Sequence, residues 1–192
     1  VLGKFPKVGE DVLIPEQWLE IAHQRWKEAH GKKPVTTEPR IMGVDVAGMG
    51  RDCTCFVERQ GVWASEFKTH NSGGSADHMK IAGAITDRRR HEIEMFVSID
   101  TIGEGAGVFS RCVENESREN ARYIISCKYS EGAKGLNGKN LTDTTGQYEF
   151  LNMRAYLFWA VRDWLNPKNE TGAMLPPDAQ FDEEATEIKW SF

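Results

Sequence analysis

The sequence lacks the long apolar run of a membrane-spanning helix, since no hydrophobic stretch approaches the roughly 20 residues that such a helix needs. It does not open with the basic and then apolar pattern of a secretory signal peptide. Its four cysteines have neither the CxxC nor the Cys/His spacing of a zinc site. We therefore expect reduced thiols, a cytoplasmic setting and no membrane partner.

Positive charge is also scarce, because 24 basic residues against 29 acidic ones leave a formal net charge of −5. This balance excludes a protein that holds nucleic acid by a broad basic surface of its own. It is compatible with a metal site, since bound cations neutralise carboxylates. The 192 residues suit one domain with a small appendage, and the hydrophobic content of 40% is ordinary for a globular protein.

Two predicted strands each carry an aspartate at or near their end and run into a glycine-rich turn. Asp45 lies at the end of the first, 41–46, and Asp100 closes the second, 95–100. If the strands are parallel neighbours, both side chains project into one crevice at the sheet edge where open α/β sheets bind ligands. Close carboxylates repel one another unless a cation separates them, which favours Mg²⁺ or Mn²⁺. The alternative for each aspartate is an ordinary turn residue before glycine.

Hydrophobic periodicity predicts five strands and five helices. The strands are 41–46, 53–59, 62–68, 95–100 and 123–127, and the helices are 15–29, 76–89, 105–117, 148–165 and 178–189. Three antiparallel strands followed by alternating helices and parallel strands is the order of an α/β, ribonuclease H-like mixed sheet flanked by helices. Cys53 and Cys55 share one face of the second strand, and we expect them to be small buried hydrophobes.

Several other stretches resemble functional motifs. Gly132–Lys139 is one residue too long for a phosphate loop, and we reject it as an ATP site. Gly103–Gly107 is interpreted as a tight turn that lets the next helix start close to Asp100. Arg88–Arg90 is interpreted as a solvated helix end favoured by the helix dipole, with a phosphate contact as the alternative.

The segment 129–146 is predicted to be a long loop, rich in glycine, without structure of its own. With Lys128 before it, and with Lys134 and Lys139 within it, this segment is either a solvated loop or a contact for DNA phosphates.

Four stretches together resemble, in order, the nuclease region of bacteriophage terminase large subunits. Gly43–Thr54 resembles the first nuclease motif of that family, and Ile99–Val108 resembles the second. The segment Phe150–Ala155, leading to Trp164, is similar to the stretch after the family's variable loop, and Leu2–Pro6 with Ile14–Trp18 is similar to the connector after its ATPase domain.

The resemblance implies a Mg²⁺- or Mn²⁺-dependent endonuclease that cuts double-stranded concatemeric viral DNA in the bacterial host cytoplasm. Asp45 and Asp100 match metal-binding acids that would hold two divalent ions, and Asp52 matches a nearby catalytic acid. Arg154 matches a family position and is a further candidate for DNA binding. The implied partners are double-stranded DNA, an ATPase domain of the same chain, the portal and the small terminase subunit.

The resemblance also implies a division of the chain. Residues 1–38 would be a helix and linker from a preceding ATPase domain, and 39–192 the ribonuclease H-like nuclease domain. The family's last catalytic acid has no counterpart here, and Asp178, Asp182 and Glu183 are not placed in the site by the resemblance. We therefore expect a domain truncated at its C-terminus, with a third metal-binding acid beyond Phe192 and weak or no activity.

Two other functional classes remain open. The first is a non-catalytic docking domain with a ribonuclease H-like fold. The second is a phosphate-binding domain of the actin/hexokinase type, because the acid, glycine-rich turn and threonine at 45–54 also resemble its first phosphate loop.

Overall fold

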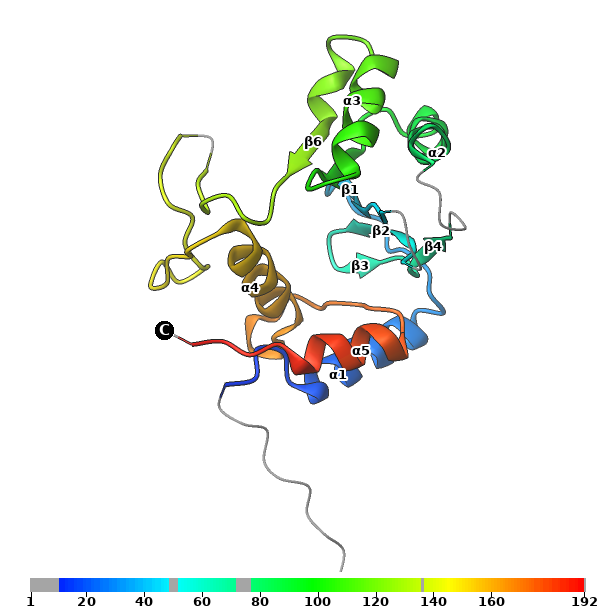
Figure 1. Ribbon diagram of the computed structural model, residues 1–192. Helices are drawn as coiled ribbons and strands as arrows, with labels where there is room; N and C mark the ends of the chain where they lie inside the picture. Colours follow the sequence, from blue (N-terminus) through cyan, green and yellow to red (C-terminus); the bar gives the residue numbers. More distant parts are fainter. Residues whose placement is uncertain (1–10, 49–51, 72–76, 136, 192) are drawn as a thin grey trace, which may run out of the picture.

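The computed structural model describes residues 11–48, 52–71, 77–135 and 137–191, which form a mixed sheet and five α-helices (Figure 1). The elements are α1 (Glu16–Glu28), β1 (Arg40–Asp45), β2 (Thr54–Gln60), β3 (Trp63–Ala64), β4 (Lys68–His70), α2 (His78–Arg90), β5 (Phe96–Asp100), α3 (Gly105–Asn115), the 3-10 turn η1 (Asn120–Tyr123), β6 (Ile124–Cys127), α4 (Met153–Leu165), the 3-10 turn η2 (Pro167–Asn169) and α5 (Ala179–Glu187). Within the described ranges, no helix has the length and apolar character needed to cross a bilayer.

The sheet is built around β1. Its strand order is β3-β2-β1-β5-β6, and β4 also pairs with β2. β1 runs antiparallel to β2 and parallel to β5, and β6 continues the parallel half. The predicted fold class, antiparallel strands followed by parallel ones and flanked by helices, is confirmed.

The third predicted strand, 62–68, is wrong in one respect, because the structure divides it into β3 and β4. Ser65 interrupts the strand: its hydroxyl accepts the Glu58 N–H at 2.9 Å, and its own N–H donates to the Glu58 carbonyl at 2.8 Å. β3 therefore pairs with the end of β2, and β4 pairs with its beginning.

One face of the sheet carries the first hydrophobic core. Met42 and Val44 of β1 pair in register with Val97 and Ile99 of β5, and all four side chains are buried. Helices α2 and α3 cover this face with aliphatic side chains such as Ile85. Because side chains alternate along a strand, Asp45 and Asp100 belong to the opposite face, whose residues are less buried.

A second hydrophobic core joins α1, α4 and α5, which lie together in Figure 1. Leu19, Trp159 and Ala185 are buried there, one from each helix. This core meets the sheet at its edge, where the Trp26 indole donates to the Ala64 carbonyl at 3.1 Å. The α1 helix is thus packed into the molecule rather than projecting from it.

The first and last described segments run antiparallel to each other. A bridge pairs Val12 with Lys189, and the Leu13 N–H donates to the Ile188 carbonyl at 2.9 Å. The Trp190 N–H completes the pair by donating to the Asp11 carbonyl at 2.9 Å.

The fourth long helix begins later than predicted, at Met153 instead of 148. Asn152 caps it by accepting the Ala155 N–H at 2.9 Å. The residues before this cap belong to the preceding loop and not to the helix, because Glu149 forms an antiparallel bridge with Thr142. The α4 helix has 13 residues, the same length as α1 and α2.

The loop 129–146, predicted to lack structure, is held by its own hydrogen bonds over its described residues. A bridge joins Lys134 and Asn140, and the buried Asp143 carboxylate accepts hydrogen bonds from Thr145, Gln147 and Tyr148. Burial raises the pKa of Asp143, but the hydrogen bonds outweigh that effect and lower the pKa below its ordinary value. Asp143 is thus an ionised anchor for the loop at neutral pH.

The α3 helix begins in direct contact with the end of β5. A Cβ on Gly105 would lie 1.7 Å from the Asp100 carbonyl oxygen, a distance that no side chain tolerates. Gly103 supplies the turn with a φ of +69°, a region that favours glycine. This arrangement agrees with the predicted role of Gly103–Gly107 as a tight turn beside Asp100.

We predict that Gly105→Ala destabilises the fold by about 3 kcal/mol, the upper end of the usual cost of overpacking. Gly83, inside α2, has no atom within 4 Å of a Cβ placed on it. Gly83→Ala is the matched control and should stabilise the protein by about 0.5–1 kcal/mol. Urea unfolding followed by circular dichroism measures both, and equal effects of the two substitutions would contradict the proposed contact.

Candidate metal centre

Asp45 and Asp100 are the last residues of β1 and β5, two parallel neighbours in the sheet. The last pair in the register of β1 and β5 is Val44 with Ile99, so the two aspartates follow it side by side. Asp45 is exposed, and Asp100 is half-buried. The structure thus brings these two predicted site residues to one edge and one face of the sheet.

The electrostatics of Asp45 show how closely the acids are grouped. Its pKa is raised above the ordinary value, first by desolvation and then by the negative charges of Asp100 and Asp52. Desolvation is the largest of these effects, and the two acidic charges add to it. A cation bound between the carboxylates would relieve the repulsion.

Two side-chain hydrogen bonds fix the turns that carry the acids. After β1, the Ala47 N–H donates to the buried Thr54 hydroxyl at 3.1 Å. After β5, the Asp100 carboxylate itself accepts the Ile102 N–H at 3.0 Å, in an Asx-turn. Met49–Arg51, part of the first motif, lie outside the described residues, and Asp52 beyond them is exposed.

A thiol flanks each aspartate across the sheet. Cys55 pairs with Asp45 in the register of β1 and β2, and Cys127 pairs with Asp100 in that of β5 and β6. Burial, followed by the charge of the paired aspartate, raises the pKa of both thiols. Both thiols therefore stay protonated at neutral pH. The candidate metal ligands among these four neighbouring side chains are then the carboxylate oxygens of the two aspartates.

The prediction that Cys53 and Cys55 are buried hydrophobes is wrong. Cys53 is exposed and Cys55 is half-buried, whereas Thr54 between them is 2% exposed. The alternation was correct, but the inward position goes to threonine because its hydroxyl binds the Ala47 N–H.

Tyr129 is a site neighbour that sequence reasoning missed. Its pKa is raised to about 12, first by desolvation and then by negative charges that include those of Asp100 and Asp45, while Arg154 opposes the rise. The Tyr129 carbonyl also accepts the Arg154 N–H at 3.0 Å, which ties the start of α4 to the end of β6. Its position directly after the β6 strand and Lys128 was the only signal in the sequence.

Arg154 is exposed, and its guanidinium lies 5.4 Å from the centre of the Phe158 ring. Lys128 forms an exposed ion pair of 3.0 Å with Glu131. Lys134 and Lys139 lie farther along the same loop, one on each side of its small turn. All four predicted DNA-binding residues thus lie on the connection between β6 and α4 or in the first turn of α4.

The basic run at the end of α2 is largely occupied within the fold. Arg88 makes a two-pronged contact with Glu58 at 2.6 and 2.8 Å. Arg89 is 1% exposed and pairs with Glu116 at 2.7 Å. The interpretation of this run as a solvated helix end is therefore wrong for Arg89, which is buried, and Arg88 is half-buried in its pair with Glu58.

The fit of the site to divalent ions rests on the carboxylates. Asp45 and Asp100 would supply oxygen ligands, and Asp52 adds charge beside them. Within the described ranges, no group of three histidine, cysteine or acidic side chains is placed to hold a metal ion. Asp178, the N-cap of α5, approaches the β2 side of the site closely enough to raise the pKa of Cys55.

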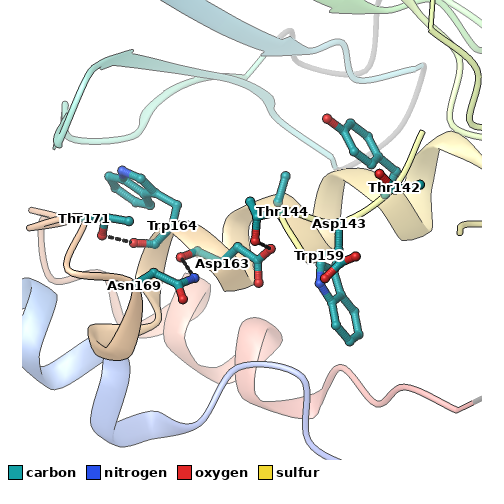
Figure 2. Close-up of a pocket in the computed structure, with 10 residues that line it drawn as sticks. Thr142, Asp143, Thr144, Trp159, Asp163, Trp164, Asn169 and Thr171 are labelled. Carbon is teal, nitrogen blue, oxygen red and sulfur yellow. Dashed lines mark hydrogen bonds between the residues drawn. The ribbon is translucent and has the colours of Figure 1, made fainter. Parts of the chain in front are cut away.

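The molecule also has a cavity of about 530 Å³ beside α4 (Figure 2). Its lining includes neither Asp45 nor Asp100. Asp163, one of its acids, accepts the Thr144 hydroxyl at 3.1 Å and pairs with Arg162 at 3.0 Å. Since its carboxylate is already bound by protein groups, we place the chemistry at the sheet edge and not in this cavity.

Comparisons with solved structures identify the fold. Nine chains match, and they include nuclease domains of a large terminase subunit. No protein-family model and no curated protein matches the sequence.

Three of the matching structures come from gp2, the large terminase subunit of bacterial virus Sf6. A mutant nuclease domain with manganese and β-thujaplicinol has a TM-score of 0.66 at 20% identity, covering 94% of this chain and 84% of that one. A mutant with calcium gives 0.66 at 21% identity, and the domain without that mutation gives 0.64 at 20%, both with the same coverage. At this identity the likeness establishes a shared fold.

We predict that Asp45→Asn raises the melting temperature of the metal-free protein at neutral pH. A carboxyl whose folded pKa is raised destabilises the fold above that pKa, and the cost vanishes below the unfolded pKa. The gain should not exceed about 2–4 °C, because solvent screens a partly exposed group. It should disappear as the pH falls through the ordinary carboxyl range.

Asp87→Asn is the control, since Asp87 is exposed in α2 and makes only a 3.5 Å pair with Arg90. Differential scanning fluorimetry from acid to neutral pH makes the comparison. A loss of stability in Asp45→Asn at neutral pH would show that the acids do not repel one another.

Proposed function

We propose that this chain is the metal-dependent endonuclease domain of a viral DNA-packaging terminase. The observation that supports the proposal is the placement of Asp45 and Asp100 side by side at the ends of adjacent parallel strands. The fold shared with terminase nuclease domains, one with manganese and one with calcium, supports the same reaction class and a divalent ion.

The proposed reaction is hydrolysis of phosphodiester bonds in double-stranded concatemeric DNA. Two bound Mg²⁺ or Mn²⁺ ions would supply an activated water and charge stabilisation for the leaving oxygen. Asp45 and Asp100 would hold these ions through their carboxylate oxygens. Asp52 adds negative charge beside Asp45 and is the third catalytic candidate.

DNA is proposed to be bound by a few basic side chains near the site and not by a broad basic surface. With a net charge of −5, the chain relies on a few phosphate contacts and on its partners. We propose that these contacts come from the connection that leaves β6 next to Asp100 and from the first turn of α4. The residues are Lys128, Lys134, Lys139 and Arg154.

The proposed partners follow from the same assignment. They are double-stranded DNA, an ATPase domain of the same chain, the portal and the small terminase subunit. We propose that residues 1–38 connect to the ATPase domain and that 39–192 form the nuclease domain. The stretch resembling the family's connector at 2–6 lies outside the described residues.

A non-catalytic docking domain is the second candidate. It is favoured by one observation, that the described residues contain no group of three side chains placed to hold a metal. The two candidates differ in one expectation. The nuclease needs the Asp45 and Asp100 carboxylates for DNA cleavage, whereas the docking domain does not cleave DNA.

We predict that the chain nicks supercoiled plasmid in Mn²⁺ and that Asp45→Asn and Asp100→Asn each slow nicking by about 100-fold, a large loss for a metal site. The asparagines keep the shape but remove the charge that holds the ion. Asp87→Asn, on an exposed part of α2, is the control and should cleave as the unsubstituted chain does. Gel electrophoresis over a Mn²⁺ and Mg²⁺ titration provides the rates.

Manganese binding is measured in parallel by the water-proton relaxation of Mn²⁺. Binding without cleavage would favour the docking domain with a vestigial site. Unchanged binding and cleavage in both aspartate variants would mean that the acids are turn residues and that the proposed site is wrong.

A further inference from the structure

An ion pair lies beside the acid-bearing turns without belonging to the predicted site. The Glu104 carboxylate is 2.6 Å from His78 Nε2, and each side chain is 34% exposed. Glu104 precedes α3, and His78 is the first residue of α2. We propose that His78 and Glu104 form a positioning pair that holds the turns after Asp45 and Asp100 in place for metal binding. The catalytic consequence of this role rests on the proposed function.

Glu104 lies beside the turn that follows Asp45. Its Cγ lies 3.7 Å from the place of a Cβ on Gly48, three residues after Asp45. The stem of Glu104 therefore borders the first turn at Gly48.

Glu104 is also bound into the turn that follows Asp100. The next residue, Gly105, packs on the Asp100 carbonyl, and the place of its Cβ is 3.6 Å from the Val46 side chain. The dipeptide 104–105 therefore packs on the end of β5 and lies beside the first turn. One displacement at this point would change the separation of the two aspartates.

His78 anchors this arrangement to the helical layer. A Cβ on Gly107 would lie 3.1 Å from His78 Nδ1, so the imidazole lies against the first turn of α3. Asp77 caps α2 by accepting the Lys80 N–H at 3.0 Å, which fixes the helix start that carries His78. The imidazole is held from two sides, with its Nε2 directed to Glu104.

The contact between the two side chains depends on the negative charge of Glu104. The atoms are close, but His78 Nε2 lacks the alignment of a hydrogen bond. The Glu104 carboxylate lies beside the first residue of α2, where the helix dipole favours negative charge. Removing the Glu104 charge should loosen the contact even though glutamine keeps the size of the side chain.

Glu104 acts through the backbone and not as a ligand. The Glu104 carboxylate is engaged with His78, whereas Asp100 and Asp52 raise the pKa of Asp45 by their charge. Nor do His78 and Glu104 join the acids in a three-ligand group within the described part of the chain. The pair therefore has the role of outer groups that orient ligands, whose loss usually costs 10–100-fold in affinity or activity.

The test compares Glu104→Gln, His78→Gln and the double variant. Glu114→Gln is the matched control, because Glu114 lies on α3 in an exposed 3.2 Å pair with Arg111. We expect each single variant to weaken Mn²⁺ binding by about 10-fold and to lower kcat for plasmid nicking at saturating Mn²⁺, with KM for DNA unchanged. The double variant should be no worse than the poorer single variant, because the two residues act as a unit.

Hydrogen exchange of the metal-free protein gives a second measurement that needs neither metal nor cleavage. The Ala47 and Ile102 amides report on the two turns, since their hydrogen bonds end on Thr54 and Asp100. Both amides should exchange faster in the Glu104 and His78 variants, while amides in the second core and all amides of Glu114→Gln stay unchanged.

The outcomes separate this inference from the proposed function. Faster exchange at both turns without cleavage by any chain would support the positioning pair and contradict the nuclease. Normal exchange at both turns would overturn the positioning pair, even if the unsubstituted chain cleaves DNA. Additive losses in the double variant would also overturn it, because the residues would then act separately.

Discussion

The repulsion between Asp45 and Asp100 is the constraint on which the proposed site depends. Parallel pairing of β1 and β5 sets the two acids side by side, and the desolvation of Asp45 raises its pKa further. The packing of Gly105 on the Asp100 carbonyl fixes the end of β5 beside this pair. In the proposed function, a bound cation would relieve the repulsion.

Much of the architecture could be predicted from the sequence because it is local. Apolar strands ending on Asp45 and Asp100, together with the order of elements, were enough to place both acids at one edge. Gly103–Gly107 was interpreted correctly because glycine has few reasons to cluster other than a turn or a close approach. The split of 62–68 was missed because it depends on one hydroxyl, that of Ser65, and on its hydrogen bonds with Glu58.

The surroundings of the acids could not be predicted, because they depend on the register between strands and helices far apart in sequence. Cys127 meets Asp100 only through the pairing of β5 with β6. Tyr129 and Arg154 are brought together by a hydrogen bond across 25 residues of chain, and no periodic pattern reports it. His78 and Glu104 belong to segments that looked unrelated, and only the packing of α2 on α3 joins them.

The antiparallel pairing of residues 11–13 with 188–190 has a mechanical consequence. Its hydrogen bonds lie one after another along the two strands, with an ion pair of 3.2 Å between Asp11 and Lys189 beside them. Tension that separates these strands from one end would load each bond in turn, whereas shear along them would load all at once. The direction of the applied force therefore determines how it reaches α1 and α5. Pulling from one end would load these helices gradually, whereas shear would load them only after all the paired hydrogen bonds had broken.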